Sequence, residues 1–245
     1  MSSKTFLLNK AKGIAFDEGS HSYYNRGGEF TSVSKVISWY VKPFNSKAIS
    51  LAIAKRDNVS QKSVLKLWED KKDVALERGN RIHNALEKYF NQDSATDFEG
   101  LESIYCQIDE MVSATGFYEF LTEQIIFNTK NLLSGTIDLM RFNPDGTVSL
   151  FDYKTNKEIT KSSKYKNKLL NGLEHLEDCH LTKYSLQLGL YKWMLEQDGF
   201  VVKDLHLIHI NHDGVVELIK CLDLSKEIEE VIMREEQTSS SVKGE

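Results

Sequence analysis

Two carboxylates and a lysine lie in a pair of short apolar runs that are joined by a turn. Residues 133–157 read LSGTIDLMRFNPDGTVSLFDYKTNK, with turn-forming residues at 143–146. Each run carries its charge at the end away from the turn: Asp138 on the first run, and Asp152 and Lys154 on the second. Burying unpaired charge in half-buried strands costs stability, so this arrangement predicts a chemical role for the three side chains.

The register of the expected hairpin brings these residues together. If the hairpin is centred near Asp145, Asp138 faces Asp152 and Thr136 faces Lys154. Because side chains alternate along a strand, all four side chains are then expected on one face of the sheet. Directly opposed carboxylates would lie about 5 Å apart and repel each other. One of them must therefore take up a proton, or both must share a cation.

A divalent cation would satisfy both carboxylates at once. Mg²⁺ and Mn²⁺ prefer hard oxygen ligands, and Mg²⁺ commonly binds through one or two carboxylates while keeping waters for a substrate phosphate. Lys154 would then hold an attacking water or balance charge on a phosphorane-like transition state. The alternative is a solvated Asp–Asp–Lys ladder held by ordinary salt bridges, since the tripeptide D-x-K is common by itself.

The first half of the chain is predicted to be a hairpin followed by helices. Residues 12–36 suggest a hairpin that turns at 26–28, followed by a helix that starts at Ser32 or Ser34. Residues 46–116 are predicted to be mostly helical, because their apolar residues recur at three-and-four spacing and few residues break the pattern.

The pattern changes from helix to strand near residue 117. Three consecutive strands are predicted first, and a polar connection rich in lysine then leads to a long helix, two further strands and a closing helix. In chain order these elements are expected within 118–129, 132–142, 147–155, 181–197, 201–210, 214–222 and 224–236.

One domain with a mixed sheet accounts for this order of elements. We expect a single domain over 1–236, with an N-terminal hairpin and helices at 1–75 and a core that carries the site at 76–236. Residues 237–245 are predicted to be a disordered tail. The fold class is α/β or α+β, a mixed central sheet flanked by helices with a helical N-terminal half.

Composition excludes several classes of protein. The chain is 40% hydrophobic and 27% charged, with no apolar stretch long enough to span a membrane, so we expect a cytoplasmic protein with no membrane partner. The separated Cys106, Cys179 and Cys221 form no C-x-x-C pair, which argues against a disulfide framework and against a zinc or iron–sulfur site held by cysteines. A net charge of −5 gives no global sign of nucleic-acid binding, although a local basic groove would suffice.

Three further segments of the chain contain short motifs of polar residues and glycine at fixed spacings. Residues 78–87, RGNRIHNALE, contain G-x-x-x-H-x-x-x-E; SGTID contains G-x-x-D; and residues 184–191, YSLQLGLY, contain Q-x-x-x-Y. With the I-D…D-Y-K hairpin these segments resemble the RecB-like exonuclease branch of the PD-(D/E)XK nuclease superfamily, with Ile137 in place of the motif's proline. SYYNRGGEFTSVSKVI is similar to the N-terminal hairpin and helix start of phage and mitochondrial members.

The resemblance implies a restriction-endonuclease-like fold and a metal-dependent DNA nuclease, with an exonuclease of replication, recombination or repair in a bacterial or phage-infected cell as the leading expectation. It implies that His83, Asp138, Asp152 and the carbonyl oxygen of Tyr153 hold Mg²⁺ or Mn²⁺, and that Lys154 positions or activates water. The alternative is a non-catalytic nucleic-acid or protein-binding module on the same fold. The presence of both acids and the lysine argues for activity.

Four more residues are secondary candidates for this site. The resemblance implies that Gln187 and Tyr191 lie beside the site and help to place the nucleic-acid backbone, and that Glu123 lies on the strand before the hairpin. Glu87, one helical turn after His83, would orient that histidine or a bound water. The alternative for His83 is a purely structural role. The alternative for the helix that carries Gln187 and Tyr191 is an ordinary amphipathic helix with Tyr191 in the core.

DNA, single-stranded or at its ends, is the expected partner. Residues 157–168 carry five lysines directly after the expected catalytic strand, and such a loop can contact phosphates. Lys161, Lys164, Lys166 and Tyr184 are therefore candidate nucleic-acid contacts. An ordinary solvated loop is the alternative.

Overall fold

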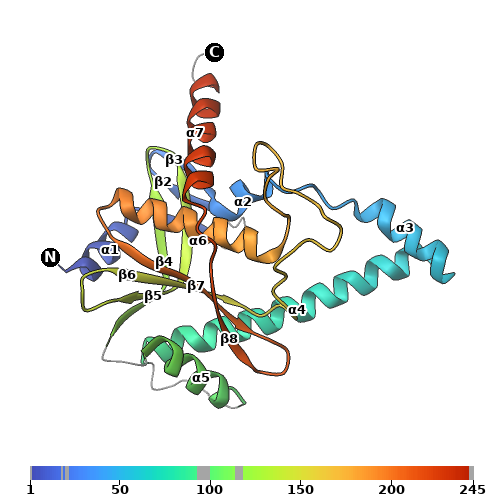
Figure 1. The fold of residues 1–245 in the computed structure, drawn as a ribbon, viewed down its shortest axis with the longest axis horizontal. Coiled ribbons are helices and arrows are strands. Elements are labelled where there is room, and N and C mark those ends of the chain that lie inside the picture. The colour runs from blue at the N-terminus through green and yellow to red at the C-terminus, as the bar shows by residue number, and fades with distance from the viewer. Residues whose placement is uncertain (1, 18, 20–21, 93–99, 114–117, 243–245) are drawn as a thin grey trace.

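The computed structural model describes residues 2–17, 19, 22–92, 100–113 and 118–242. Over these residues the chain forms helices on both sides of one mixed eight-stranded sheet (Figure 1). The helices are α1 Ser3–Ala11, α2 Val33–Ser38, α3 Ser46–Asp57, α4 Gln61–Phe90, α5 Glu102–Ser113, α6 His180–Gln197 and α7 Ser225–Val242. The strands are β1 Ala15–Asp17, β2 Ser22–Asn25, β3 Gly28–Ser32, β4 Glu119–Asn128, β5 Leu133–Phe142, β6 Val148–Lys154, β7 Val202–Ile210 and β8 Val216–Lys220. The expected mixed α/β class is confirmed.

The hairpin β5–β6 has the register expected of a turn centred near Asp145. Phe142 pairs with Val148, and the antiparallel pairing continues as far as Leu139 and Phe151. Gly146 closes the turn with a φ of +82°, which glycine adopts without steric cost. The turn-forming residues and the apolar alternation therefore set this register locally.

Beyond Leu139 the two strands of the hairpin separate. β6 continues in parallel pairing with β7 as far as Lys154, while the same edge of β5 is taken at its other end by β3. Along 135–138, therefore, the described pairings of β5 are with β4 alone. This fork opens the sheet at Asp138.

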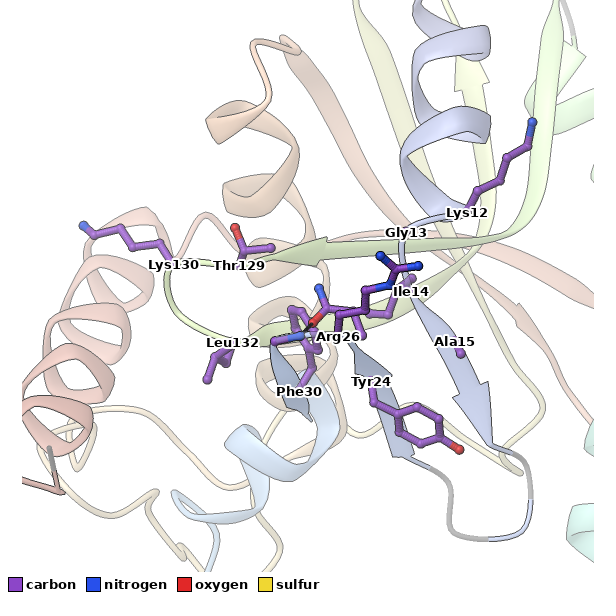
Figure 2. A pocket seen from close by; sticks show the side chains of 12 residues that line it. Lys12, Gly13, Ile14, Ala15, Tyr24, Arg26, Phe30, Thr129, Lys130 and Leu132 are labelled. Carbon is purple, nitrogen blue, oxygen red and sulfur yellow. Dashed lines mark hydrogen bonds between the residues drawn. The ribbon is translucent and has the colours of Figure 1, made fainter.

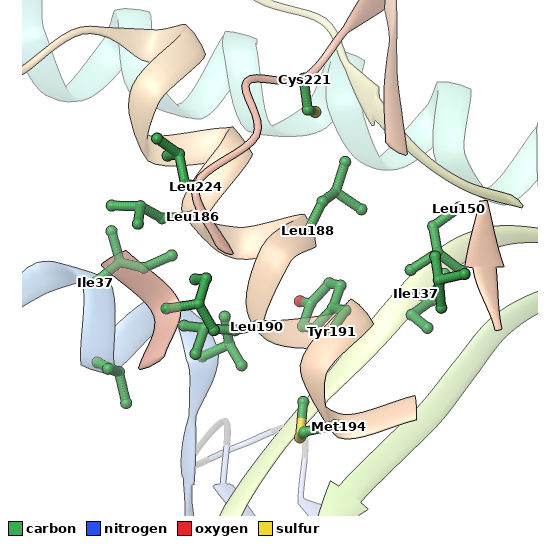
Figure 3. Close-up of a cluster of buried hydrophobic side chains, with 14 of the residues drawn as sticks. Ile37, Ile137, Leu150, Leu186, Leu188, Leu190, Tyr191, Met194, Cys221 and Leu224 are labelled. Atoms are coloured by element: carbon green, nitrogen blue, oxygen red, sulfur yellow. The ribbon is translucent and has the colours of Figure 1, made fainter. Parts of the chain in front are cut away.

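Two apolar clusters cover the two faces of the sheet. Leu139 and Tyr153 pack with α4 and α5, whereas Ile137 and Met140 pack with α2, α6 and α7. Figure 3 shows this second cluster, with Ile137 and Leu186 among its buried side chains. Because Ile137 and Leu139 belong to opposite clusters although they are two positions apart, the strict alternation expected of this strand is broken beside Asp138.

The N-terminal elements match their expected places, with one addition. The hairpin β2–β3 turns at Arg26 and Gly27, and the Ser32 hydroxyl caps α2 by accepting a hydrogen bond from the Lys35 amide at 3.3 Å. The helices α3, α4 and α5 fill most of 46–116, part of which lies outside the described residues. The helix α1 was not expected, because its apolar residues do not gather on one face.

The closing helix α7 extends past its expected end at residue 236. It continues through 237–242, which the sequence assigned to a disordered tail; residues 243–245 lie outside the described part of the chain. Buried Ile228 and Val231 anchor its first half, and residues 225–242 contain no glycine or proline that would end the helix. Of the helices described here, none combines the length and apolar character needed to cross a membrane.

The long helix α4 offers a matched pair of leucines that tests this packing. Leu86 is 1% exposed in the cluster under the sheet, and Leu67 is 52% exposed on the part of α4 that projects away from the sheet (Figure 1). Leu86→Ala should lower the free energy of unfolding by about 2–5 kcal/mol. Leu67→Ala should change it by less than about 0.5 kcal/mol. Urea denaturation measures both, and equal losses would contradict the packing described.

Candidate active site

Side chains from both layers meet at the fork of the sheet. His83 comes from α4 on one face, and Gln187 comes from α6 on the other. Between them lie Asp138 on β5, and Asp152 and Lys154 at the end of β6. Most of the charged residues that the sequence predicted for the site therefore lie at the fork, where side chains from both faces of the sheet can meet.

Three of these side chains form a group with the chemistry of a metal site. One ligand atom each from His83, Glu123 and Asp138 lies within 4.8 Å of the other two. His83 Nδ1 is 3.7 Å from Asp138 Oδ2 and 3.9 Å from Glu123 Oε1. Glu123, expected only as a secondary candidate, thus belongs to the centre of the group.

The backbone at Glu123 is strained. Its φ is +44°, inside a strand in which non-glycine residues normally have negative φ. In the register of β4 and β5, Glu123 lies opposite Asp138, and the residues on either side of it pair regularly. Strained backbone of this kind clusters at functional sites. The distortion coincides with the break in alternation on β5.

Asp138 bears an electrostatic penalty at this site. Burial and the nearby Asp152 carboxylate raise its pKa to about 7, although the positive charges of His83 and Lys154 act in the opposite direction. One stabilising contact is the Tyr153 amide, which donates a hydrogen bond to Asp138 Oδ2 at 2.8 Å. The fork makes this bond available, because β6 no longer pairs with β5 there.

Asp152 and Lys154 form an ion pair beside this group. Asp152 is 2% exposed, and its other oxygen, Oδ1, accepts a hydrogen bond from Gln187 Nε2 at 3.1 Å. Burial by itself would lower the pKa of Lys154, but the charges of Asp152 and Asp138 outweigh it and raise that pKa. Lys154 therefore remains an ammonium at neutral pH, with Nζ 4.5 Å from the centre of the Tyr184 ring.

His83 responds to the same excess of negative charge. Burial lowers its pKa, but the nearby carboxylates of Glu123, Asp138 and Asp152 outweigh burial and raise the pKa above its ordinary value. In the absence of metal the protonated imidazole offsets part of the carboxylate charge. The edge of the His83 ring meets the Tyr153 ring at a centroid distance of 5.4 Å, which fixes its orientation.

The Q-x-x-x-Y helix and the G-x-x-D strand depend on each other physically. Gln187 Nε2 donates to the Tyr191 hydroxyl at 3.2 Å as well as to Asp152. Tyr191 is buried, and a Cβ atom at Gly135 would lie only 2.4 Å from its ring. Tyr191 is thus both a core residue and a support for Gln187. The expected place beside the site and the alternative place in the core are therefore compatible.

Arg78 fixes α4 to the ends of two strands and was missed by the sequence analysis. Its guanidinium donates to the carbonyl oxygen of Thr155 at 2.9 Å and to that of Asn211 at 2.5 Å. The signal was its place at the start of the histidine segment. The next residue, Gly79, is not required by close packing, because a Cβ atom there would meet Thr155 Oγ1 at an ordinary 3.4 Å.

The remaining candidates lie around the site. Burial and the charge of Glu123 raise the pKa of Glu87, which places it near the metal group, but its expected role in orienting His83 stays a prediction. The hydroxyl of Tyr184 donates to Asn156 at 3.1 Å, beside the Lys154 ion pair. The candidate lysines of the basic loop, by contrast, are exposed and make at most weak contacts: Lys161, Lys164 and Lys166.

A polar cavity of about 270 Å³ opens next to the metal group. Glu123 and Gln187 line it on the side of the site, and Thr136, Tyr23 and Ser34 line it on the side of the N-terminal hairpin. The hydroxyls of Tyr23 and Thr136 are 2.8 Å apart and hydrogen-bonded, which ties the hairpin to the stretch of β5 that pairs with β4 alone. The cavity gives the site room for a polar ligand.

Comparison with known proteins identifies a family. The model of the PD-(D/E)XK nuclease superfamily matches residues 99–239, a range that includes Asp138, Asp152 and Lys154 but begins after His83. With the mixed sheet, this match confirms the expected restriction-endonuclease-like architecture. No match is found among curated proteins. A solved structure, "Crystal structure of SSO0001", is 14% identical over 95% of this chain and 84% of its own, with a TM-score of 0.37, which is too low to support an argument.

Two glycines near the site should respond to alanine in opposite ways. Gly135→Ala forces a Cβ atom into the Tyr191 ring, so the free energy of unfolding should fall by about 1–3 kcal/mol. Gly79→Ala meets only an ordinary contact with Thr155 and replaces a glycine inside α4, so stability should rise by up to about 1 kcal/mol. Chemical denaturation measures both changes. A tolerated alanine at residue 135 would contradict the close approach of strand and helix.

The raised pKa of Asp138 predicts how stability depends on pH without metal. Below the unfolded-state pKa of about 4 both states are protonated and the group has no effect. As the pH rises to about 7 the unfolded state ionises first, so this carboxyl progressively destabilises the fold. Asp138→Asn should therefore raise the Tm at pH 8 by a few degrees, and less at pH 5.

Asp152→Asn is the matched control for this measurement. It leaves the Lys154 ammonium without its buried partner, so the Tm should fall at pH 8 rather than rise. Thermal unfolding in EDTA measures both variants. A fall in the Tm of Asp138→Asn at pH 8 would contradict the electrostatic account of the fork.

Proposed function

The chain belongs to the PD-(D/E)XK nuclease superfamily, and from this premise we propose that it is a metal-dependent nuclease that hydrolyses phosphodiester bonds of DNA. Within that function we propose a RecB-like exonuclease that acts in replication, recombination or repair in the cytoplasm of a bacterial or phage-infected cell. Single strands or DNA ends are its proposed substrates.

The observation that carries this proposal is the group of His83, Glu123 and Asp138 at the fork. The donor set fits a divalent cation such as Mg²⁺ or Mn²⁺, since it offers two hard carboxylates and one imidazole within 4.8 Å of one another. The raised pKa of Asp138 supports the same conclusion, because burial and the neighbouring Asp152 carboxylate disfavour its ionised form, which a cation would stabilise. We propose Asp152 and the carbonyl of Tyr153 as further ligands.

The protein's own residues account for the rest of the chemistry. When bound, the metal ion supplies positive charge to the scissile phosphate and lowers the pKa of the attacking water. Lys154, held charged by Asp152, would position that water and offset charge that develops on the phosphate. Gln187 holds the Asp152 carboxylate in place. Hydrolysis forms one P–O bond to water and breaks the P–O bond to the leaving sugar hydroxyl, which takes up a proton.

Two contacts support the RecB-like branch in particular. The histidine of the G-x-x-x-H segment, His83, lies in the metal group rather than elsewhere on α4. The glycine of the G-x-x-D strand, Gly135, lies against Tyr191 of the Q-x-x-x-Y helix. Three segments that are separate in the sequence thus meet at one site, which an accidental set of matches would not be expected to do.

End-labelled DNA tests the activity and its polarity together. Wild-type protein with Mg²⁺ or Mn²⁺ should degrade single-stranded DNA labelled at either the 5′ or the 3′ end, with double-stranded DNA and RNA as comparison substrates. Lys154→Ala should lower the rate by about 10²- to 10³-fold. The matched control is Lys203→Ala, which removes an exposed lysine paired with Asp145 at the turn of the hairpin and should leave the rate unchanged.

The outcomes separate the alternatives. Cleavage that is equal in wild type and Lys154→Ala would overturn the mechanism. DNA binding without cleavage under any metal would favour the non-catalytic binding module. Internal cleavage of a circular single strand would keep the nuclease but overturn the exonuclease assignment.

A further inference from the structure

A basic cavity lies at the end of β5 opposite the hairpin turn. It measures about 760 Å³ and is bounded by the end of α1, the β2–β3 turn and the β4–β5 turn. Lys12, Arg26 and Lys130 line it, and no acidic side chain does so among the described residues. Figure 2 shows Arg26 at the β2–β3 turn, with Lys12 and Lys130 on either side of it and their side chains extending outward. In a chain of net charge −5 this local gathering of cations stands out.

We propose that this cavity binds the backbone of the single-stranded polynucleotide on which the metal site acts. This inference rests on the proposed nuclease function and extends it, because it assigns a second contact on the substrate, away from the scissile bond. The basic loop at 157–168 was the expected contact. The cavity is a different surface, built from the end of α1, the N-terminal hairpin and the β4–β5 turn.

The charged residues of the cavity suit phosphate groups. Lys12, Arg26 and Lys130 are all exposed, so their charged groups can reach a ligand without leaving a buried position. Lysine and arginine that contact phosphates provide most of the sequence-independent affinity for nucleic acids. Exposed positive charges around the cavity also favour association with a polyanion over association with a small neutral ligand.

The aromatic wall of the cavity favours a single strand over a duplex. Tyr24 is 38% exposed on the hairpin, and buried Phe30 and Ile14 form an apolar floor. Unpaired bases stack on exposed aromatic rings beside a basic groove, whereas the bases of a duplex present no free face. The combination of Tyr24 with Arg26 therefore selects a single strand.

The position of the cavity fits a substrate that is already held at the metal group. From Leu133, which follows the cavity residue Leu132, to Asp138, β5 advances five residues, about 17 Å at 3.4 Å per residue. That length corresponds to about five phosphates at the spacing of a B-form strand. The smaller cavity lies against the same hairpin, since Phe16 and Tyr23 line it while their neighbours Ala15 and Tyr24 line the basic one.

Binding measurements separate the charged and aromatic contributions. The affinity for a labelled single-stranded 20-mer is measured by fluorescence anisotropy across a salt series, in a Lys154→Ala background and in EDTA so that the substrate is not consumed. Arg26→Ala/Lys130→Ala should weaken binding and reduce the slope of log K against log[salt] by about 1.4, which is about 0.7 for each phosphate that the variant no longer neutralises. Tyr24→Ala should weaken binding about tenfold with an unchanged slope.

A matched double variant and a metal titration complete the test. Lys203→Ala/Lys220→Ala removes two exposed lysines from β7 and β8 and should change neither affinity nor slope. Mn²⁺ binding to the wild-type protein is measured separately. Failure to bind Mn²⁺ or to cleave DNA would overturn the proposed function, whatever the cavity does.

The cavity proposal has its own contradictory outcomes. It is overturned if Mn²⁺ and DNA bind but the Arg26→Ala/Lys130→Ala variant keeps the wild-type slope. It is equally overturned if that variant loses affinity only for duplex DNA, or if inorganic phosphate or an acidic peptide competes as well as the 20-mer does.

Discussion

Negative charge buried at a break in the sheet is the constraint on which the site depends. Asp138, Asp152 and Glu123 come from three consecutive strands, and among the described side chains the charges of Lys154 and His83 offset them. The protein lowers the cost with local devices, which are an amide hydrogen bond to Asp138, a paired lysine at Asp152 and a raised pKa at His83. A divalent cation bound between the carboxylates would offset the remaining free-energy cost of burying their charge, and it would supply the positive charge that the proposed hydrolysis needs.

The scaffold provides the fork that makes this arrangement possible. β6 stops pairing with β5 after Phe151, which lies opposite Leu139, and continues beside β7. The Tyr153 amide therefore donates its hydrogen bond to the Asp138 side chain and not to a backbone carbonyl of β5. Arg78 ties the helix that carries His83 to the ends of the diverging strands. On the other face, Gly135 lets α6 approach closely enough for its glutamine to reach Asp152. The site is thus held from both layers.

Local sequence predicted what local interactions determine. The hairpin register followed from its turn and apolar alternation, and the predicted strands and the long helix of the second half were found where expected. The central place of Glu123 could not be predicted, because it depends on the pairing of β4 with β5 and on a φ of +44°. For the same reason the expectation that all the charged side chains share one face was too simple: Asp138 contacts His83 from α4, whereas Asp152 contacts Gln187 from α6. The fork also requires the parallel pairing of β3 with β5, which joins residues about a hundred positions apart and leaves no local signal.

The most direct test is a calorimetric titration of the wild-type protein with Mn²⁺ at pH 7, in two buffers of different ionisation enthalpy. Because Asp138 has a pKa of about 7 and the pKa of His83 is raised, binding should release about one proton or more from these two groups. Asp138→Asn should weaken the binding and reduce the proton release. Mn²⁺ binding with no proton release, or no binding at all, would contradict the claim that the buried charge at the fork is there to hold a metal ion.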